Sequence, residues 1–398
     1  MKKEELFKEL RAKLGRDFQL PALSAVALKL VELATDDTKS ATDLALWIEK
    51  DPSLSARVLQ MANSAYFPKT KPVSTIKEAI VRIGFNRLRI MALSLSLRDT
   101  FPMGKLGKLD CEKFWKVSLY RGTIARELSR KLKIAEAEEA FLSGLILEIG
   151  LLVFFLRFLK DIPLKEEIDI SDLGQLISFE EENFGINHRQ LGEFLLHEWK
   201  LPEHIVITQR TGLPAEDPHN YTDLQLICHL AVILSKIPTS SYANFETPYE
   251  EAKKLLPIED DLIDEVLIKS MNQIETLADS LKIQVNKEQE IIEIMDKARK
   301  TLSKISERLV LDSDSTGELP TFETIKSYAP ENIKVLEAIS HEIRNPLLAV
   351  GGFAKRLAKT LDPTSKGSEY VNIILKEAER LERVLSELKE LAQPQRII

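Results

Sequence analysis

Apolar residues recur at helical spacing through most of the first 280 positions of the chain. One predicted helix face is marked by Leu23, Val26, Ala27, Leu30 and Leu33, and the next apolar segment holds Leu44, Leu46, Trp47 and Ile48. No convincing run alternates apolar and polar residues as a half-buried strand would. The pattern therefore predicts an all-α fold.

Residues that start and stop helices punctuate this pattern. Asp51 precedes a proline and offers a helix N-cap, and Thr75 with Glu78 has the spacing of a capping box. Asn63 closes the helix that begins after Asp51, and Gly84 follows the next helix as a C-terminal cap. These signals predict helices packed in a compact antiparallel manner.

The longest apolar stretch runs from residue 140 to residue 159. Its length would suit a membrane span, but Glu148 lies at its middle and Arg157 near its end. A buried core helix, broken near Gly150, is the expected structure. A carboxylate in such a helix either finds partners or takes up a proton, so we expect Glu148 to be a satisfied core or pocket residue rather than a catalytic one.

Two further apolar seams lie near the end of the sequence. The first repeats every seven residues and consists of Leu336, Ile343, Val350 and Leu357, with Ile339, Pro346 and Phe353 between them. The second follows a turn at 361–367 and consists of Val371, Ile374, Ala378, Leu381, Leu385, Leu388 and Ala392. Two such helices make an antiparallel hairpin. Because a lone hairpin cannot bury both seams, we predict a four-helix bundle formed with a second copy.

A Glu/Lys-rich segment at 286–310 carries another seam of the heptad type. Its apolar positions are Ile291, Met295, Ala298, Leu302, Ile305 and Leu309, which predicts a signalling coiled coil. Small polar residues follow, and Pro320 and Pro330 mark two breaks, so 311–330 is predicted to be a linker.

The composition is that of an ordinary globular protein of 398 residues, 44% hydrophobic and 29% charged. The net charge of −7 argues against a general nucleic-acid-binding surface, which needs clustered Lys and Arg. The first residues lack the apolar run of a signal peptide. Only Cys111 and Cys228 are present, so neither a disulfide framework nor a cysteine zinc site is expected. We expect a cytoplasmic protein that binds neither nucleic acid nor membrane.

His341 carries the most specific candidate chemistry. Neutral imidazole is a nitrogen nucleophile near neutral pH, and the adjacent Glu342 could orient the ring or take its proton. Asn345 lies about one helical turn further along the same face, where a phosphate could meet both side chains. On the heptad register His341 occupies position f and faces water. An isolated surface pair of this kind would simply be solvated, but the neighbouring seams favour a functional role.

The run from His341 to Leu347, HEIRNPL in one-letter code, resembles the H-box of sensor histidine kinases. The resemblance covers about 331–395 and implies a dimerisation and phosphoacceptor domain. It implies that His341 is the phosphoacceptor, Glu342 its base or orienter, and Asn345 a residue that positions phosphate. The implied partners are a second copy of the chain through 331–395, a response-regulator receiver domain, and a kinase ATP-binding domain.

The ATP-binding domain of that family is missing from this sequence. Only Gly367 follows Gly352, so there are no glycine-rich lid motifs. We expect no cofactor in this chain, with ATP-Mg only on a missing or separate kinase domain, and we do not expect an autonomous kinase. Two explanations stay open: a segment cut from a longer kinase, which the ending at 391–395 favours, or a naturally short protein phosphorylated by another enzyme.

Three segments of the helical region resemble the HDOD family. They are 48–54, 58–67 and 76–84, which read IEKDPSL, VLQMANSAYF and IKEAIVRIG. The resemblance spans about 18–282. The family is associated with bacterial signal transduction and is related to metal-dependent HD phosphohydrolases, whose ligands it has lost. Leu147 and Glu148 stand at the His-Asp positions of those enzymes, and Val117 and Val232 stand near two others.

Five histidines of this region could be considered as metal ligands. They are His188, His197, His204, His219 and His229. They lie on different predicted helices and in one loop, without ligand spacing such as HExxH. We expect structural or surface histidines, no metal, and an HDOD domain that is inactive as a phosphohydrolase.

The predicted organisation is an N-terminal helix at 1–17, an HDOD domain at 18–282, the coiled coil at 286–310, the linker at 311–330 and the phosphoacceptor domain at 331–395. The predicted function is two-component signal transduction, in which the HDOD domain senses or scaffolds and His341 passes phosphate to a response regulator. The alternative is a non-enzymatic scaffold whose hairpin only dimerises. A cyclic-nucleotide phosphodiesterase of the HD type is disfavoured because its ligand set is absent.

Overall fold

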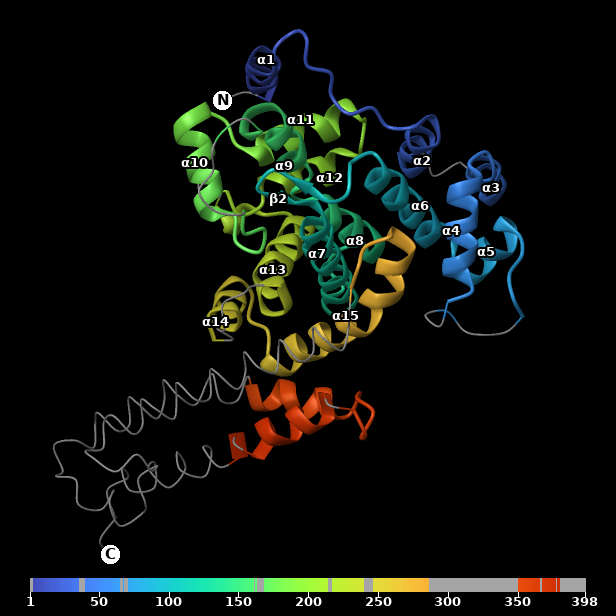
Figure 1. The fold of residues 1–398 in the computed structure, drawn as a ribbon, viewed down its shortest axis with the longest axis vertical. Coiled ribbons are helices and arrows are strands. Elements are labelled where there is room, and N and C mark those ends of the chain that lie inside the picture. The colour runs from blue at the N-terminus through green and yellow to red at the C-terminus, as the bar shows by residue number, and fades with distance from the viewer. Residues whose placement is uncertain are drawn as a thin grey trace, which may run out of the picture. The chain divides into compact units, whose positions relative to one another are not determined.

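The computed structural model of the chain contains two compact units (Figure 1). Unit 1 is Met1–Thr239 with Lys269–Val285, and unit 2 is Ser240–Ile268 with Asn286–Ile398. The structure describes residues 3–35, 40–64, 67, 71–160, 162, 168–213, 217–239, 246–285, 350–365, 367–376 and 378–379. About 74% of the structure is helical and almost none of the described residues lie in a sheet, which confirms the predicted all-α fold.

The first part of unit 1 is a group of short helices. They are α1 (Lys3–Leu14), α2 (Ala25–Thr35), α3 (Ala41–Glu49), α4 (Pro52–Ala62), α5 (Ile76–Ile83) and α6 (Phe85–Asp99). Helices α2 to α6 pack on one another, in blue at one side of unit 1 (Figure 1). The predicted caps are confirmed: Asp51 accepts a hydrogen bond from the Leu54 N–H, Thr75 and Glu78 form a capping box, and Gly84 ends α5 with φ +93°.

The remainder of unit 1 is built around the long central helix α7 (Cys111–Leu132), which packs against α8 (Ala137–Ile146) and α13 (Asp223–Thr239). A second packed pair joins α9 (Ile149–Phe154) to α11 (His188–Glu198). The other elements are β1 (Lys105–Leu106), β2 (Leu109–Asp110), a π-helix (Phe155–Leu159), α10 (Gly174–Phe184), α12 (Glu203–Val206) and 3₁₀ turns at Ile207–Arg210 and Pro218–Asn220.

The apolar stretch predicted as a core helix is buried. Among the described residues, Ala137–Leu159 is long and apolar enough to cross a membrane, and 83% of its most apolar window lies inside the structure. The predicted break near Gly150 is confirmed: α8 ends at Ile146 and α9 begins at Ile149, so Leu147 and Glu148 form the junction. Gly150 itself lies within α9, where a Cβ atom would collide with the His188 carbonyl oxygen of α11. The absence of a side chain at Gly150 therefore lets α9 and α11 pack closely.

Three details differ from the sequence predictions. Leu46, placed with the apolar positions of α3, is 53% exposed, because it lies on the opposite side of the helix from the buried Leu44 and Ile48. His188 and His197 were assigned to different helices, but both belong to α11. The short antiparallel ribbon of β1 and β2 was not predicted, since two-residue strands carry no alternation. Both cysteines are buried free thiols.

Unit 2 contains α14 (Glu246–Leu255), the start of α15 (Asp260–Leu281) as far as Ile268, and the described part of the C-terminal hairpin. The hairpin is helical at 350–358, turns at 359–365, and is helical again at 367–376 and 378–379. The predicted hairpin is thus present over these residues. The predicted coiled coil at 286–310 and linker at 311–330 lie outside the described residues and stay predictions.

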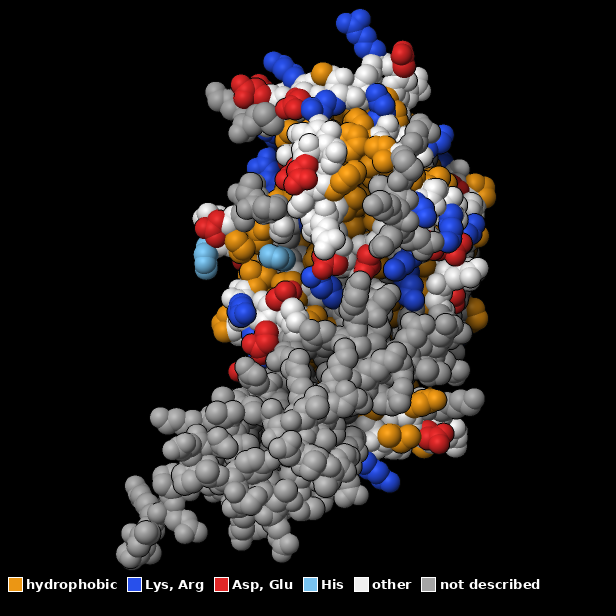
Figure 2. Space-filling view, turned by 60° about the vertical axis from the view of Figure 1, so that its left-hand side comes forward, with side chains coloured by type: hydrophobic (Ala, Val, Ile, Leu, Met, Phe, Trp, Pro, Cys, Tyr) orange, Lys and Arg blue, Asp and Glu red, His pale blue; other side chains and the backbone are white. Residues whose placement is uncertain are grey.

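The surface of the described residues mixes charges of both signs. On the face shown in Figure 2, acidic and basic side chains are interspersed with apolar ones. A general nucleic-acid-binding face would need Lys and Arg gathered together, and the described side chains on this face show no such gathering. The net charge of −7 describes the balance over the whole chain.

Candidate functional site

The predicted phosphoacceptor group lies outside the described residues. This applies to His341, Glu342 and Asn345 alike, so the roles assigned to them stay predictions. The structure describes the same predicted helix from Val350 onward.

The described part of the hairpin buries both predicted seams. Val350, Phe353 and Leu357 of the first helix are at most 2% exposed. Val371, Ile374 and Ala378 of the second helix are at most 6% exposed. Gly351 lets the two helices approach closely, because a Cβ atom on it would lie 3.3 Å from the Ala378 Cβ. The heptad register is therefore confirmed over these residues.

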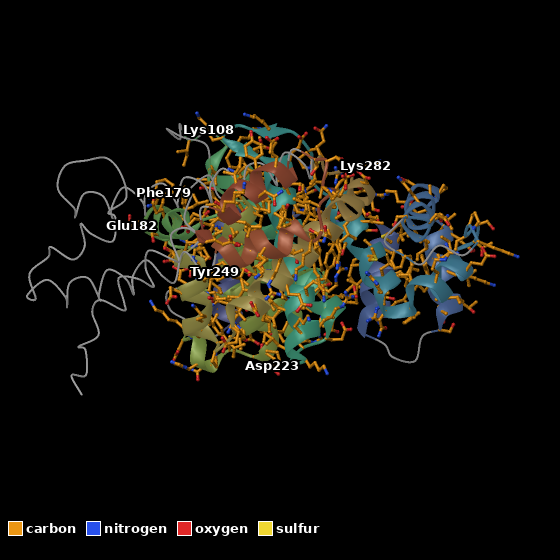
Figure 3. All side chains as sticks on the ribbon, turned by 90° about the horizontal axis from the view of Figure 1, so that it is seen from below. Lys108, Phe179, Glu182, Asp223, Tyr249 and Lys282 are labelled. Atoms are coloured by element: carbon orange, nitrogen blue, oxygen red, sulfur yellow. The ribbon has the colours of Figure 1, made fainter. Side chains whose placement is uncertain are left out.

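A polar cluster joins the hairpin to α14 and α15 within unit 2. Arg356 forms ion pairs with Asp261 and, at 3.5 Å from Nε to Oδ2, with Asp264. The Tyr249 hydroxyl of α14, labelled in Figure 3, donates to the Asp264 carboxylate. Gly352 faces the same carboxylate, since a Cβ atom on it would lie 2.9 Å from Oδ2. The helix that should carry His341 thus touches α15 through a specific contact.

Burial governs the protonation of this cluster. It raises the pKa of Asp264 to about 7, although the Tyr249 hydrogen bond and Arg356 act in the opposite direction. Burial and the nearby Asp264 carboxylate hold the pKa of Tyr249 well above its usual range, so the phenol stays protonated and donates. The contact is consequently sensitive to proton concentration near neutral pH.

A second cluster, in unit 1, surrounds Glu148. Arg189 donates to both carboxylate oxygens, at 2.9 Å from Nε and 2.6 Å from Nη2. Arg121 Nη1 lies 2.9 Å from Oε1, and His188 Nε2 lies 3.0 Å from Oε2. The other ring nitrogen of His188 lies 2.6 Å from Glu180 Oε2. All five side chains are buried, and we refer to them as the buried ionic network.

The charges in the buried ionic network stabilise one another. Burial acts to raise the pKa of Glu148, but Arg189, His188 and Arg121 together outweigh it, and the pKa lies well below its usual range. Burial acts to lower the pKa of His188, but Glu180 and Glu148 raise it to about 9. His188 is therefore an imidazolium at neutral pH, donating from both nitrogens.

Local structure brings these residues together from four helical elements. Glu148 lies in the junction between α8 and α9, where the helix breaks and its carboxylate turns inward. His188 and Arg189 open α11, which begins at the capping box of Asn187 and Gln190. Glu180 of α10 also accepts from the His188 N–H, at 2.8 Å. The helix start is thus bonded to the network it carries.

Both carboxylate oxygens of Glu148 are occupied by Arg121, His188 and Arg189. Within the described residues, no group of three or more His, Cys, Asp or Glu is arranged to hold a metal ion. The side chains of Leu147, Val117 and Val232, at or near the positions of the lost ligands, cannot coordinate a cation. Of the remaining predicted histidines, His204 pairs with Glu139 at 3.1 Å on α8.

Sequence reasoning identified Glu148 as an unusual carboxylate and as a satisfied one, and this is confirmed by its three partners. It missed Arg121, Arg189 and Glu180. A signal was present for Arg121, whose neighbours in the helix are largely apolar, but Arg189 and Glu180 stand among polar residues and carry no such signal. A buried arginine requires an acidic partner, but that requirement does not identify which carboxylate the partner is.

Comparison with known families finds a match for each of the two predicted domains. Residues 20–211 match the HDOD domain, and residues 331–396 match the His Kinase A (phospho-acceptor) domain, abbreviated HisKA. The chain joins an HDOD domain to a HisKA domain. The HisKA domain and its kinase relatives support a role in two-component signal transduction.

The relatives match only parts of this chain, and each matched segment covers only part of the relative's own length. An uncharacterised protein of Treponema pallidum is 24% identical over 281 residues, 68% of this chain and 50% of that protein. YuxH of Bacillus subtilis, also uncharacterised, is 28% identical over 130 residues, 32% of this chain and 31% of its own. The sensor histidine kinase ZraS of Salmonella typhimurium is 45% identical over 56 residues, 14% of this chain and 12% of the kinase.

A solved structure supports the fold. An HDOD domain protein of unknown function from Geobacter sulfurreducens has a TM-score of 0.54 and 19% identity, covering 71% of this chain and 99% of that one. At this identity the likeness concerns the fold alone.

Proposed function

We propose that the protein is a cytoplasmic, homodimeric two-component signalling protein in which His341 accepts a phosphoryl group and passes it to a response regulator. The observation that carries the proposal is the HisKA match over residues 331–396, which include His341 and its neighbours Glu342 and Asn345. The buried seams at Val350 and Val371 support it, because they give the hairpin that such a domain needs.

The chemistry assigns one role to each residue. A nitrogen of neutral His341 attacks the γ-phosphorus of ATP held by a separate kinase domain, so that a P–N bond forms and the P–O bond to ADP breaks. Glu342 orients the imidazole ring or takes the proton that the other ring nitrogen of His341 loses, and Asn345 positions the phosphate. A carboxylate of the receiver domain then attacks phosphorus, the P–N bond breaks, and the imidazole recovers its proton.

The HDOD domain has a physical route to this histidine. Helix α15 begins beside Arg356 and Gly352 of the phosphoacceptor helix and continues into unit 1. A change in the HDOD domain that moved or rotated α15 would therefore act on the helix that carries His341. In this proposal the HDOD domain senses a condition or scaffolds a partner, and α15 transmits the result.

The test is acid-labile phosphate on the chain after incubation with a histidine kinase catalytic domain and ATP-Mg. Wild type should be labelled, His341→Gln should not, and His219→Gln, which changes an exposed histidine, should be labelled like wild type. Transfer from His341 to a purified receiver domain should then remove the label. Absence of label on wild type, with a kinase domain that labels its own substrate, would leave the scaffold alternative, in which the hairpin only dimerises.

A further inference from the structure

Gly212 borders a small recess in the HDOD domain between α11 and α13. It follows the 3₁₀ turn at Ile207–Arg210, has φ +74° and is exposed. The nearest heavy atoms to a Cβ atom built on it are Arg189 Nη1 and His229 Nε2, both at 3.7 Å. A Cβ atom there would be in ordinary van der Waals contact with both nitrogens, so the recess is the space that the absent side chain leaves beside the exposed Gly212.

Arg189 has a nitrogen to spare at this recess. Its Nε and Nη2 atoms are occupied by Glu148 in the buried ionic network. Its Nη1 atom is buried and has no hydrogen-bond partner within the described structure, while the whole residue is 4% exposed. A buried guanidinium N–H without an acceptor is costly, so this geometry is suited to an acceptor that enters at Gly212.

His229 borders the recess on the side opposite Arg189. It belongs to α13, whose first residue, Asp223, is labelled in Figure 3. Burial lowers the pKa of His229 to about 4, and the charges of Arg189 and Lys236 act in the same direction. Its Nδ1 atom is buried without a partner among the described residues, and its Nε2 atom faces the recess. The ring is therefore neutral in cationic surroundings.

The loop that carries Gly212 is held in place by two contacts. The Gly212 N–H donates to the Tyr221 hydroxyl at 2.6 Å, and the Tyr221 ring lies 5.7 Å from the His229 ring between centroids. These contacts fix the distance between Gly212 and α13. The recess is thus part of the folded structure on both sides.

We propose that this recess, between Gly212, Arg189 and His229, binds a small oxyanion group, that is, a carboxylate or a phosphate. Arg189 Nη1 donates one hydrogen bond to the anion and His229 Nε2 donates a second. The site does not depend on phosphate transfer to His341, and it gives the HDOD domain a ligand class to sense.

The test is a titration of the full chain followed by NMR of the histidine ring nitrogens. The probes are inorganic phosphate, acetate and a nucleoside monophosphate, with sodium chloride at equal ionic strength as the control. Binding should shift the His229 signals and raise the His229 pKa, because an anion favours the imidazolium. The site is supported if at least one probe binds and chloride does not. The probe that binds most tightly identifies the source of the oxyanion. If no probe shifts His229, the proposal is wrong.

Variants separate this site from general ion binding. Removing either donor should weaken binding roughly tenfold or more, since a hydrogen bond to a charged group is lost. His229→Gln tests the outer wall, and Arg189→Lys keeps the charge but removes the fork of nitrogens. His219→Gln is the matched control in the neighbouring loop and should bind like wild type. Because Arg189→Lys also touches the network and could impair folding, His229→Gln is decisive. Unchanged affinity in that variant, by calorimetry with the same probe, would overturn the assignment.

Discussion

The carboxylate of Glu148 receives hydrogen bonds from three side chains at a place where it is 1% exposed. Taking charges out of water is expensive, and their mutual attraction repays the cost only with good geometry and full pairing. The network therefore need not make the fold more stable than apolar residues would. Its members are nevertheless strongly dependent on one another, because any single loss leaves buried charges without partners.

Glu148→Gln should consequently destabilise unit 1 by about 3–5 kcal/mol, the usual cost of removing one partner from a buried ion pair. The amide would retain the shape of the side chain but leave Arg189 and Arg121 without a counter-charge. Urea unfolding followed by tryptophan fluorescence measures this, because all three tryptophans, Trp47, Trp115 and Trp199, belong to unit 1.

The control is Glu203→Gln, which removes the exposed ion pair with Lys3. A surface pair of this kind contributes about 0–1 kcal/mol to stability, so the unfolding midpoint of the Glu203→Gln variant should stay near that of wild type. Equal effects of the two substitutions would contradict the view that burial makes Glu148 special.

His188 gives the network a defined dependence on pH. Its pKa rises from 6.5 to about 9 on folding, so the protonated ring stabilises the fold fully below pH 6.5, and this contribution is lost as the pH rises through about 9. Between these limits the difference in free energy of unfolding between wild type and His188→Gln should shrink by about 3 kcal/mol, at about 1.36 kcal/mol per pKa unit. Titrating groups that do not contact His188 cancel in this difference. A difference that does not change with pH would mean that the folded ring is neutral.

At the scale of single elements, the contact between α15 and the hairpin depends on Gly352. Alanine there would favour the helix by about 1 kcal/mol through its propensity. Its Cβ, however, would lie 2.9 Å from the Asp264 carboxylate, which Tyr249 holds in place. Overpacking of this kind costs about 1–3 kcal/mol, so we expect the steric effect to win.

Gly352→Ala should therefore loosen this contact, seen as faster hydrogen exchange at 350–358 and at the start of α15. Lys355→Ala is the control, because Lys355 is exposed on the same helix and its replacement gains helix propensity without a clash. Slower exchange in Gly352→Ala than in wild type would show that propensity outweighs the contact.

The elements themselves were largely predictable, and their partners were not. The helix starts at Asp51 and Thr75 follow from side chains that bond to their own backbone a few residues away, which is information contained in a short stretch of sequence. The pairing of Arg189 with Glu148 joins residues 41 positions apart, and no local pattern specifies it. The role of Gly150 was not predictable for the same reason, because the absence of its side chain is required by the contact with α11, which no pattern near Gly150 indicates.

At the scale of the whole molecule, the second hairpin helix shows why a partner copy is expected. Its seam residues Val371 and Ile374 are buried within the chain, yet Tyr370 and Ile373 on the same helix are 43% and 53% exposed. Residues three apart lie on one helical face, so these two large apolar side chains form a continuous exposed strip. In the proposed four-helix bundle, the second copy of 331–395 would cover this strip.

Ile373→Asp should accordingly weaken the dimer. An isoleucine side chain contributes about 1.5–3 kcal/mol when it moves from water into an interface, and two-fold symmetry makes each substitution count twice. The dissociation constant from sedimentation equilibrium should therefore rise at least roughly tenfold. Val81→Asp is the matched control, because Val81 is 87% exposed on α5 and lies outside the proposed interface. If wild type sediments as a monomer throughout, or if both variants dimerise like wild type, residues 331–395 do not form the proposed bundle, and the scaffold alternative loses its dimer as well.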